Sequence, residues 1–167
     1  MDSEEELYNS LSSVADRLVR LLTGRFLYLA AAESCTGGLI ADSIIRISGA
    51  SACFWGSFVC YTSPAKIQML GVKKYTLNTY GAVSRETAKA MVMGALEKSN
   101  AGAGVSVTGL AGPDGDGSGI PVGTVWIAAA LRSGAELVKE FHFSGSRNNV
   151  RMQAAREAIV QITELLL

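Results

Sequence analysis

The sequence predicts an α/β fold, namely a single three-layer α/β/α sandwich with a mixed sheet over residues 1–167. The apolar stretch Phe26 to Ala32 has strand length and runs through a glycine turn into a helical pattern, which is an α/β unit. Residues 124–131 and 136–143 are strand patterns separated by a hairpin-length connection, so they form an antiparallel pair. No internal repeat or long linker divides the chain, which favours one core.

Helical patterns precede, separate and follow these strands. The first is an amphipathic helix over residues 7–21, with a capping box at Ser3 and Glu6 and a stop at Gly24. A second helix begins at about Leu39 and ends at Gly49. The other expected elements are a strand over residues 54–61, a short helix from Pro64 to Gly71, a helix capped by Ser84, a strand over residues 104–107 and a last helix capped by Ser146.

Charge and composition exclude several classes of partner. Fifteen Lys and Arg balance fifteen Asp and Glu, so no broad basic field is available to hold nucleic acid or an anionic membrane. The longest uncharged run, residues 47–65, is too rich in Gly, Ser, Thr and Pro for a membrane span. The three cysteines are an odd number, so they cannot all form disulfides within the chain. The N-terminus is acidic and does not have the pattern of a signal peptide. We therefore expect a cytoplasmic protein in a reducing compartment.

Ser34 is the first candidate for chemistry, because it lies at the predicted strand-to-helix turn. A hydroxyl at such a turn is held beside unpaired helix N–H groups, where acyl-transfer enzymes place a nucleophile. Ser and Thr are also ordinary helix caps, so the turn alone leaves both roles open. Cys35 competes as nucleophile, since a helix N-terminus lowers the pKa of a thiol, although a small buried residue is its commoner role.

A base for Ser34 has to come from elsewhere in the chain. His142 is the single histidine, and near the end of a predicted strand a structural role is commoner than a place in a Ser-His-Asp triad. A lysine can replace histidine where burial favours its neutral form. Lys66 follows an apolar strand and has no charged neighbour close by in sequence; a solvated helix lysine is the alternative. Tyr61 ends that strand, where its phenol can transfer a proton or simply pack.

The segment from Thr108 to Gly119 is a glycine-rich loop, which lets backbone N–H groups approach a phosphate or carbonyl oxygen. It lacks the ending of a P-loop, and a strand rather than a helix follows it, so neither common nucleotide motif is supported. Asp114, Asp116 and Ser118 imitate the start of an EF-hand, but Val125 occupies the twelfth position, which argues against calcium. No Cys or His cluster has zinc spacing either, so we expect neither a metal nor another cofactor.

A phosphate on the substrate would need a local positive charge. Arg147 and Arg151 are one helical turn apart on one face of the last predicted helix. They can form a phosphate clamp, and two solvated arginines on an exposed face are the equally weighted alternative.

Four segments together resemble the CinA C-terminal domain family, and the resemblance covers nearly the whole chain. It implies one amidohydrolase domain of the stand-alone type, which converts nicotinamide mononucleotide to nicotinic acid mononucleotide and ammonia. The family's loop usually has a Gly-Gly pair and a lysine before Pro-Val-Gly-Thr, where this chain has Asp116-Gly117 and Ile120. The segments are Ala32-Glu33-Ser34-Cys35-Thr36-Gly37-Gly38, Tyr61 with Lys66, Thr108-Gly109-Leu110-Ala111-Gly112-Pro113 and Pro121-Val122-Gly123-Thr124-Val125.

The resemblance also assigns roles. It implies that Ser34 is the nucleophile, Lys66 the general base, Tyr61 a third member that supports proton transfer and Thr108 a further helper in the site. We expect the oxyanion at N–H groups near Gly37 and Gly38. The residues expected to bind the substrate are Cys35, Thr36, Gly37, Gly38, Gly109, Gly112, Arg147 and Arg151.

Two other functions compete with this interpretation. A non-catalytic nucleotide-binding module would keep the fold and the glycine-rich loop and would bind without releasing ammonia. An amidase for another small carboxamide is the second alternative, because motifs do not report pocket shape. The resemblance and the apolar share of 49% also predict a homodimer.

Overall fold

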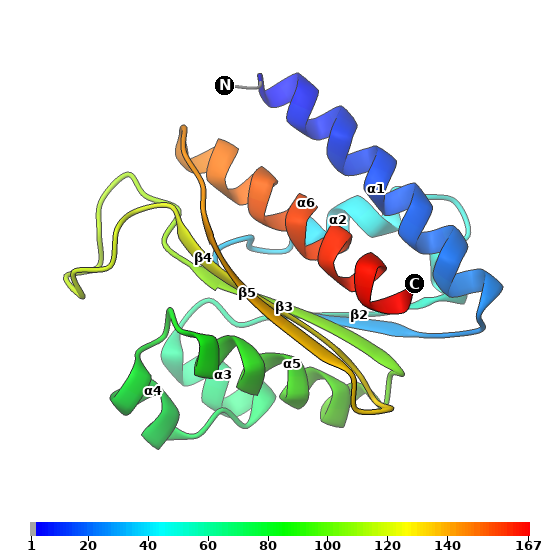
Figure 1. The fold of residues 1–167 in the computed structure, drawn as a ribbon. Coiled ribbons are helices and arrows are strands. Elements are labelled where there is room, and N and C mark those ends of the chain that lie inside the picture. Colours follow the sequence, from blue (N-terminus) through cyan, green and yellow to red (C-terminus); the bar gives the residue numbers. More distant parts are fainter. Residues whose placement is uncertain (1–2) are drawn as a thin grey trace.

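The computed structural model describes residues 3–167 and confirms the predicted α/β class (Figure 1). Five strands form one sheet in the order β2-β1-β3-β4-β5. β1 pairs in parallel with β2 and β3, and β4 pairs antiparallel with β3 and β5, so the sheet is mixed. The strands are β1 (Leu29–Glu33), β2 (Phe54–Val59), β3 (Ala103–Gly109), β4 (Thr124–Leu131) and β5 (Glu136–His142).

Helices cover both faces of the sheet. Figure 1 shows α1, α2 and α6 on one face and α3, α4 and α5 on the other. This arrangement gives the predicted three layers. The helices are α1 (Glu4–Gly24), α2 (Leu39–Ile45), α3 (Ser63–Leu70), α4 (Lys74–Tyr80), α5 (Arg85–Ser99) and α6 (Arg147–Leu166), with a short 3-10 helix at Ala50–Ala52. Within residues 3–167, none of them has the length and the apolar run that a bilayer crossing requires.

The strand β1 is buried along its whole length and is an inner strand of the sheet, between β2 and β3. Leu29 and Ala31 face the core formed with α1, α2 and α6, whereas Ala30 and Ala32 face the core formed with α3 and α5. A strand that is buried on both faces needs apolar residues at every position, which explains the continuous apolar run that ends at Ala32. The residue that follows β1 therefore stands on a rigid support.

Several boundaries differ from the sequence-based prediction. The strand does not begin at Phe26: that residue is 94% exposed, has φ of 53° and completes the turn that ends α1. The second predicted helix ends at Ile45 instead of Gly49. The helix α4 was missed because it buries none of its residues and so has no apolar periodicity. The capping boxes at Ser3 and Ser146 and the caps at Thr62 and Ser84 are present.

Close packing of α5 against the end of α3 gives a stability prediction. A Cβ added at Gly94 would lie 2.1 Å from the carbonyl oxygen of Leu70, which is backbone and cannot move aside cheaply. We expect Gly94→Ala to lower the free energy of unfolding by about 2–3 kcal/mol, measured by urea denaturation. Gly24→Ala is the matched control, because Gly24 is also helical and has nothing within 4 Å. Equal stabilities for the two variants would contradict the packing.

Candidate active site

A cavity of about 280 Å³ lies beside the carboxyl ends of the parallel strands. Residues that follow β1 and β2 and the end of β3 form much of its wall, and the glycine-rich loop and α6 complete it. Ligands of open α/β sheets bind at this edge. The predicted site residues that line the cavity are Ser34, Cys35, Tyr61, Lys66, Thr108, Gly109, Gly112 and Arg147.

Ser34 and Lys66, which are 32 positions apart in the sequence, meet in this cavity. The Nζ of Lys66 donates a hydrogen bond of 2.8 Å to the Oγ of Ser34 and one of 3.0 Å to the carbonyl oxygen of Cys60. Ser34 follows β1, while Thr62 caps α3 and so places Lys66 near the start of that helix. The predicted pairing of these two residues is therefore geometrically possible without any rearrangement.

The surroundings of Lys66 favour its neutral form. Only 2% of the residue is exposed. Burial lowers the pKa of the Lys66 amine below its ordinary value of 10.5, and the nearby thiols of Cys60 and Cys35 only partly oppose this effect. A neutral amine has a lone pair and can accept the proton of a hydroxyl. The alternative of a solvated helix lysine is wrong for this residue.

The thiol of Cys35 lines the cavity but is a poor candidate for the nucleophile because of its raised pKa. Burial raises the pKa of Cys35 to about 12, so the thiol stays protonated at neutral pH. Burial likewise raises the pKa of Cys60 to about 11. Both side chains behave as small buried residues, and this leaves the hydroxyl of Ser34 as the better candidate.

The turn after β1 is built differently from the sequence-based expectation. The N–H of Gly37 donates to the carbonyl oxygen of Ser34 at 3.1 Å, and the N–H of Gly38 donates to the carboxylate of Glu33 at 3.0 Å. Both groups therefore already have partners, whereas we expected N–H groups near Gly37 and Gly38 to hold an oxyanion. Within residues 3–167, the N–H of Thr36 donates to no other residue, and neither does the N–H of Cys35. It belongs to the residue directly after Ser34, which is the position that supplies an oxyanion donor at a nucleophile turn.

Arg147 connects two walls of the cavity. Its Nη2 donates to the Tyr61 hydroxyl at 2.8 Å, and its Nη1 donates to the carbonyl oxygen of Gly112 at 2.6 Å. The Tyr61 hydroxyl therefore contacts Arg147, and no hydrogen bond joins it to Lys66 or Ser34 in the part of the chain that the structure describes. Thr108 is only 1% exposed, and its hydroxyl donates a hydrogen bond to the carbonyl oxygen of Ala82.

Arg151 lies behind the turn and does not line the cavity. Its guanidinium donates to the carbonyl oxygens of Cys35 at 3.3 Å and Thr36 at 3.0 Å, and to the side chain of Asn148. Thr36, Gly37 and Gly38 also stand outside the cavity wall. Of the two arginines that the sequence suggested as a clamp, Arg147 lines the cavity and Arg151 does not.

Sequence reasoning missed the contacts of Glu33. Its carboxylate is fully buried and accepts hydrogen bonds from the backbone at the start of α2 and from two hydroxyls. The available signal was a carboxylate directly after a strand of alanines, a few residues before the N–H groups of a helix. Asp114 and Asp116 also line the cavity.

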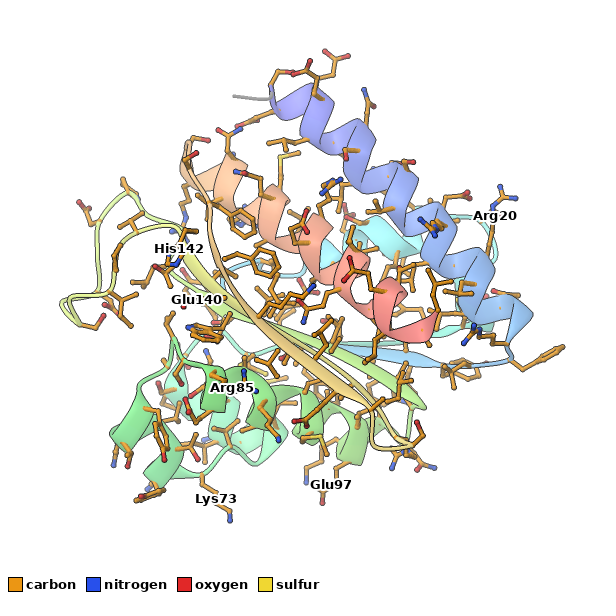
Figure 2. The ribbon with its side chains drawn as sticks, viewed as in Figure 1. Arg20, Lys73, Arg85, Glu97, Glu140 and His142 are labelled. Carbon is orange, nitrogen blue, oxygen red and sulfur yellow. The ribbon has the colours of Figure 1, made fainter. Side chains whose placement is uncertain are left out.

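His142 stands apart from the cavity. Its side chain is 66% exposed, and its Nε2 lies 3.7 Å from the carboxylate of Glu140. Both residues are labelled in Figure 2. Other labelled charges, such as Arg20, Lys73 and Glu97, point away from the sheet. Among residues 3–167, no group of three or more His, Cys, Asp or Glu is placed to hold a metal ion.

Comparisons with known proteins identify the family. The family model described as "CinA C-terminal domain" matches residues 11–166. The chain belongs to the CinA C-terminal domain family. A relative in this family, "Nicotinamide-nucleotide amidohydrolase PncC" from Enterobacter agglomerans, is 48% identical over 77% of this chain and 78% of its own length. The protein of the same name from Escherichia coli (strain K12) is 40% identical over 95% of this chain and 96% of its own.

A solved CinA-family structure has the same fold. The competence/damage inducible protein CihA from Agrobacterium tumefaciens superposes with a TM-score of 0.91 at 42% identity, covering 93% of this chain and 95% of that one. The resemblance that the sequence motifs suggested is thereby confirmed.

Proposed function

We propose that this protein is a nicotinamide-nucleotide amidohydrolase, which uses Ser34 and Lys66 to hydrolyse the carboxamide of nicotinamide mononucleotide. The observation that carries the proposal is the 2.8 Å hydrogen bond between the Lys66 amine and the Ser34 hydroxyl inside a cavity. The names of the CinA-family relatives support the choice of substrate. Neither a metal nor another cofactor is needed for the reaction that follows.

In the first half of the reaction, neutral Lys66 takes the proton of Ser34 as the Oγ attacks the carboxamide carbon. The Cys35 N–H stabilises the resulting oxyanion. The Lys66 ammonium then returns the proton to the leaving nitrogen, the C–N bond breaks and ammonia departs. The carbonyl carbon remains as an ester on Ser34.

In the second half, Lys66 takes a proton from water as the water oxygen attacks this ester. The bond to Ser34 Oγ breaks, and Ser34 recovers a proton from Lys66. The product is nicotinic acid mononucleotide, so the sum is one amide and one water converted to a carboxylate and ammonium. The positive charge of the substrate's pyridinium ring makes the carbonyl more electrophilic throughout.

A substrate panel tests the proposal. We expect ammonia release from nicotinamide mononucleotide, with much weaker release from nicotinamide riboside, nicotinamide and unrelated small carboxamides. A wild-type protein that binds the nucleotide by calorimetry but releases no ammonia would favour the binding module. Faster turnover of another carboxamide would show that nicotinamide mononucleotide is not the preferred substrate, while the assignment as an amide hydrolase would stand.

The predicted homodimer stays a prediction, and sedimentation velocity measures the oligomeric state.

The lowered pKa of Lys66 gives the reaction a pH dependence. Lys66 has to be neutral to act as a base, so activity is lost as the pH falls through its pKa. We expect kcat/KM to rise about tenfold per pH unit on the acid side and to level off above that pKa, at a pH below 10.5. A kcat/KM that falls as the pH rises over this acid range would contradict the assignment of Lys66 as the base.

Arg147 is the proposed phosphate ligand, because it is the predicted arginine that lines the cavity. We expect Arg147→Ala to raise KM for nicotinamide mononucleotide about 10–100-fold, the usual effect of losing a charge-assisted hydrogen bond. Nicotinamide riboside, which lacks the phosphate, is the matched control substrate, and its kcat/KM should change far less. Equal losses for both substrates would show that Arg147 acts through Tyr61 instead.

A further inference from the structure

The mechanism above assigns no role to Glu33, although its carboxylate is one of the most enclosed polar groups of the protein. The residue has 0% exposure. No Lys, Arg or His lies within ion-pair distance of it in the described part of the chain. Burying an unpaired carboxylate is costly unless hydrogen bonds replace the lost water. Such a group needs a structural or functional reason.

Five donors surround this carboxylate. Its Oε2 accepts from the Thr36 hydroxyl at 2.8 Å and from the N–H groups of Gly38 and Ile40 at 3.0 Å each. Its Oε1 accepts from the N–H of Ala41 at 3.1 Å and from the Ser57 hydroxyl on β2 at 2.8 Å. One side chain therefore joins the end of β1, the nucleophile turn, the start of α2 and the edge strand. Five hydrogen bonds from several segments of the chain to one side chain restrict the movement of the turn.

The backbone around Glu33 also ties the nucleophile to its base. The N–H of Cys60 donates to the carbonyl oxygen of Glu33 at 2.7 Å, and the carbonyl oxygen of Cys60 accepts from the Lys66 amine. The N–H of Ser34 donates to Val107 on β3 at 3.0 Å. A short covalent and hydrogen-bonded path thus connects Ser34, Glu33, Cys60 and Lys66. Tilting the turn would change the distance between the reacting hydroxyl and the amine.

The same network decides which N–H groups stay free. Glu33 occupies the N–H groups of Gly38, Ile40 and Ala41, and Gly37 donates to Ser34. On the opposite side, Arg151 occupies the carbonyl oxygens of Cys35 and Thr36. Among residues 3–167, the N–H groups of Thr36 and of Cys35, the residue directly after Ser34, donate to no other residue. The start of α2 is consequently used to hold the turn and is not open to the substrate.

We infer that Glu33 is the positioning residue of the nucleophile turn: its buried carboxylate holds Ser34 against Lys66 and leaves the Cys35 N–H to receive the oxyanion. The inference rests on the proposed function in that it requires Ser34 to be a nucleophile. It does not require nicotinamide mononucleotide to be the substrate.

Glu33→Gln is the variant that tests this role, because it keeps the shape and replaces one acceptor oxygen with an NH₂ donor that faces other donors. We expect kcat for nicotinamide mononucleotide to fall about 100-fold while KM stays within about threefold, since a misplaced turn affects the transition state most. We also expect covalent labelling of Ser34 by a fluorophosphonate, followed by peptide mass spectrometry, to slow by a similar factor.

Asp42→Asn is the matched control. It makes the same chemical change on α2, but the side chain of Asp42 is 44% exposed and pairs with Arg46. Its kcat and labelling rate should equal those of the wild type. Melting temperatures of all variants show whether each is folded at the assay temperature. A folded Glu33→Gln protein with wild-type kcat and labelling rate would overturn the inference, as would a loss confined to KM.

Two milder variants cover the case in which Glu33→Gln does not fold. Ser57→Ala and Thr36→Val each remove one of the five hydrogen bonds and leave the carboxylate buried. We expect each to slow labelling of Ser34 about 3–10-fold, as for a lost hydrogen bond; wild-type labelling rates in both would overturn the inference.

The labelling experiment also tests the role of Glu33 independently of the proposed substrate. If wild-type Ser34 is labelled but no ammonia is released from nicotinamide mononucleotide, the substrate proposal fails, and the labelling rates of the variants still decide the role of Glu33. If wild-type Ser34 is neither labelled nor active, Ser34 is not a nucleophile and the inference fails with it.

Discussion

Ser34→Ala is expected to lower kcat for nicotinamide mononucleotide by about 10⁴-fold or more, the usual result of deleting a nucleophile that acts together with its base. The change removes one oxygen atom from a buried position that contacts Lys66 at 2.8 Å. Binding should survive, because the rest of the cavity wall is unchanged. Calorimetry with the product, nicotinic acid mononucleotide, measures that binding without the complication of turnover.

The competing nucleophile gives this experiment its sharpest control. If Ser34→Ala kept near-normal activity while Cys35→Ala lost it, the nucleophile would be the thiol, in spite of its raised pKa. Ser133→Ala, in the exposed connection between β4 and β5, should retain wild-type activity and controls for purification.

Lys66→Met is the second variant with a large expected effect. Methionine has a similar length and no proton to exchange, so it removes the base and fills much of the space. We expect kcat to fall about 10²–10⁴-fold, the usual contribution of general acid–base catalysis. Steady-state kinetics at several pH values measure the loss, and the acid limb assigned to Lys66 should vanish with the amine.

Lys66→Arg separates the base from the charge. An arginine keeps a positive group near Ser34, but its guanidinium does not lose a proton in proteins. We therefore expect this variant to be as inactive as Lys66→Met. Substantial activity in Lys66→Arg would mean that Lys66 contributes a positive charge to the site and takes no proton from Ser34.

Local patterns predicted the elements that place the site. The apolar run before Glu33, the glycine pair after Ser34 and the proline before Lys66 are features of neighbouring residues, so the strand, the turn and the helix could be predicted from them. The pairing of Ser34 with Lys66 was implied by the resemblance to the family, and the structure places both residues at the carboxyl ends of parallel strands.

The remaining features depend on side chains that are distant in sequence. Nothing local shows that Arg151 donates to the carbonyl oxygens of Cys35 and Thr36 across 115 or 116 positions, or that Arg147 contacts Tyr61 across 86. The expectation of an oxyanion held by N–H groups near Gly37 and Gly38 did not include the acceptors that the fold supplies to these two groups, namely the carboxylate of Glu33 and the carbonyl oxygen of Ser34. Tertiary contacts decide which groups stay available.

A double-mutant cycle tests most directly whether Ser34 and Lys66 act as one unit. The measurement compares kcat for nicotinamide mononucleotide in the wild type, Ser34→Ala, Lys66→Met and the protein with both changes. If Lys66 serves only to activate Ser34, the double variant should lose no more than Ser34→Ala alone, because the second change removes a group that no longer has a partner. Losses that multiply, or a Ser34→Ala protein that turns over at the wild-type rate, would contradict the account.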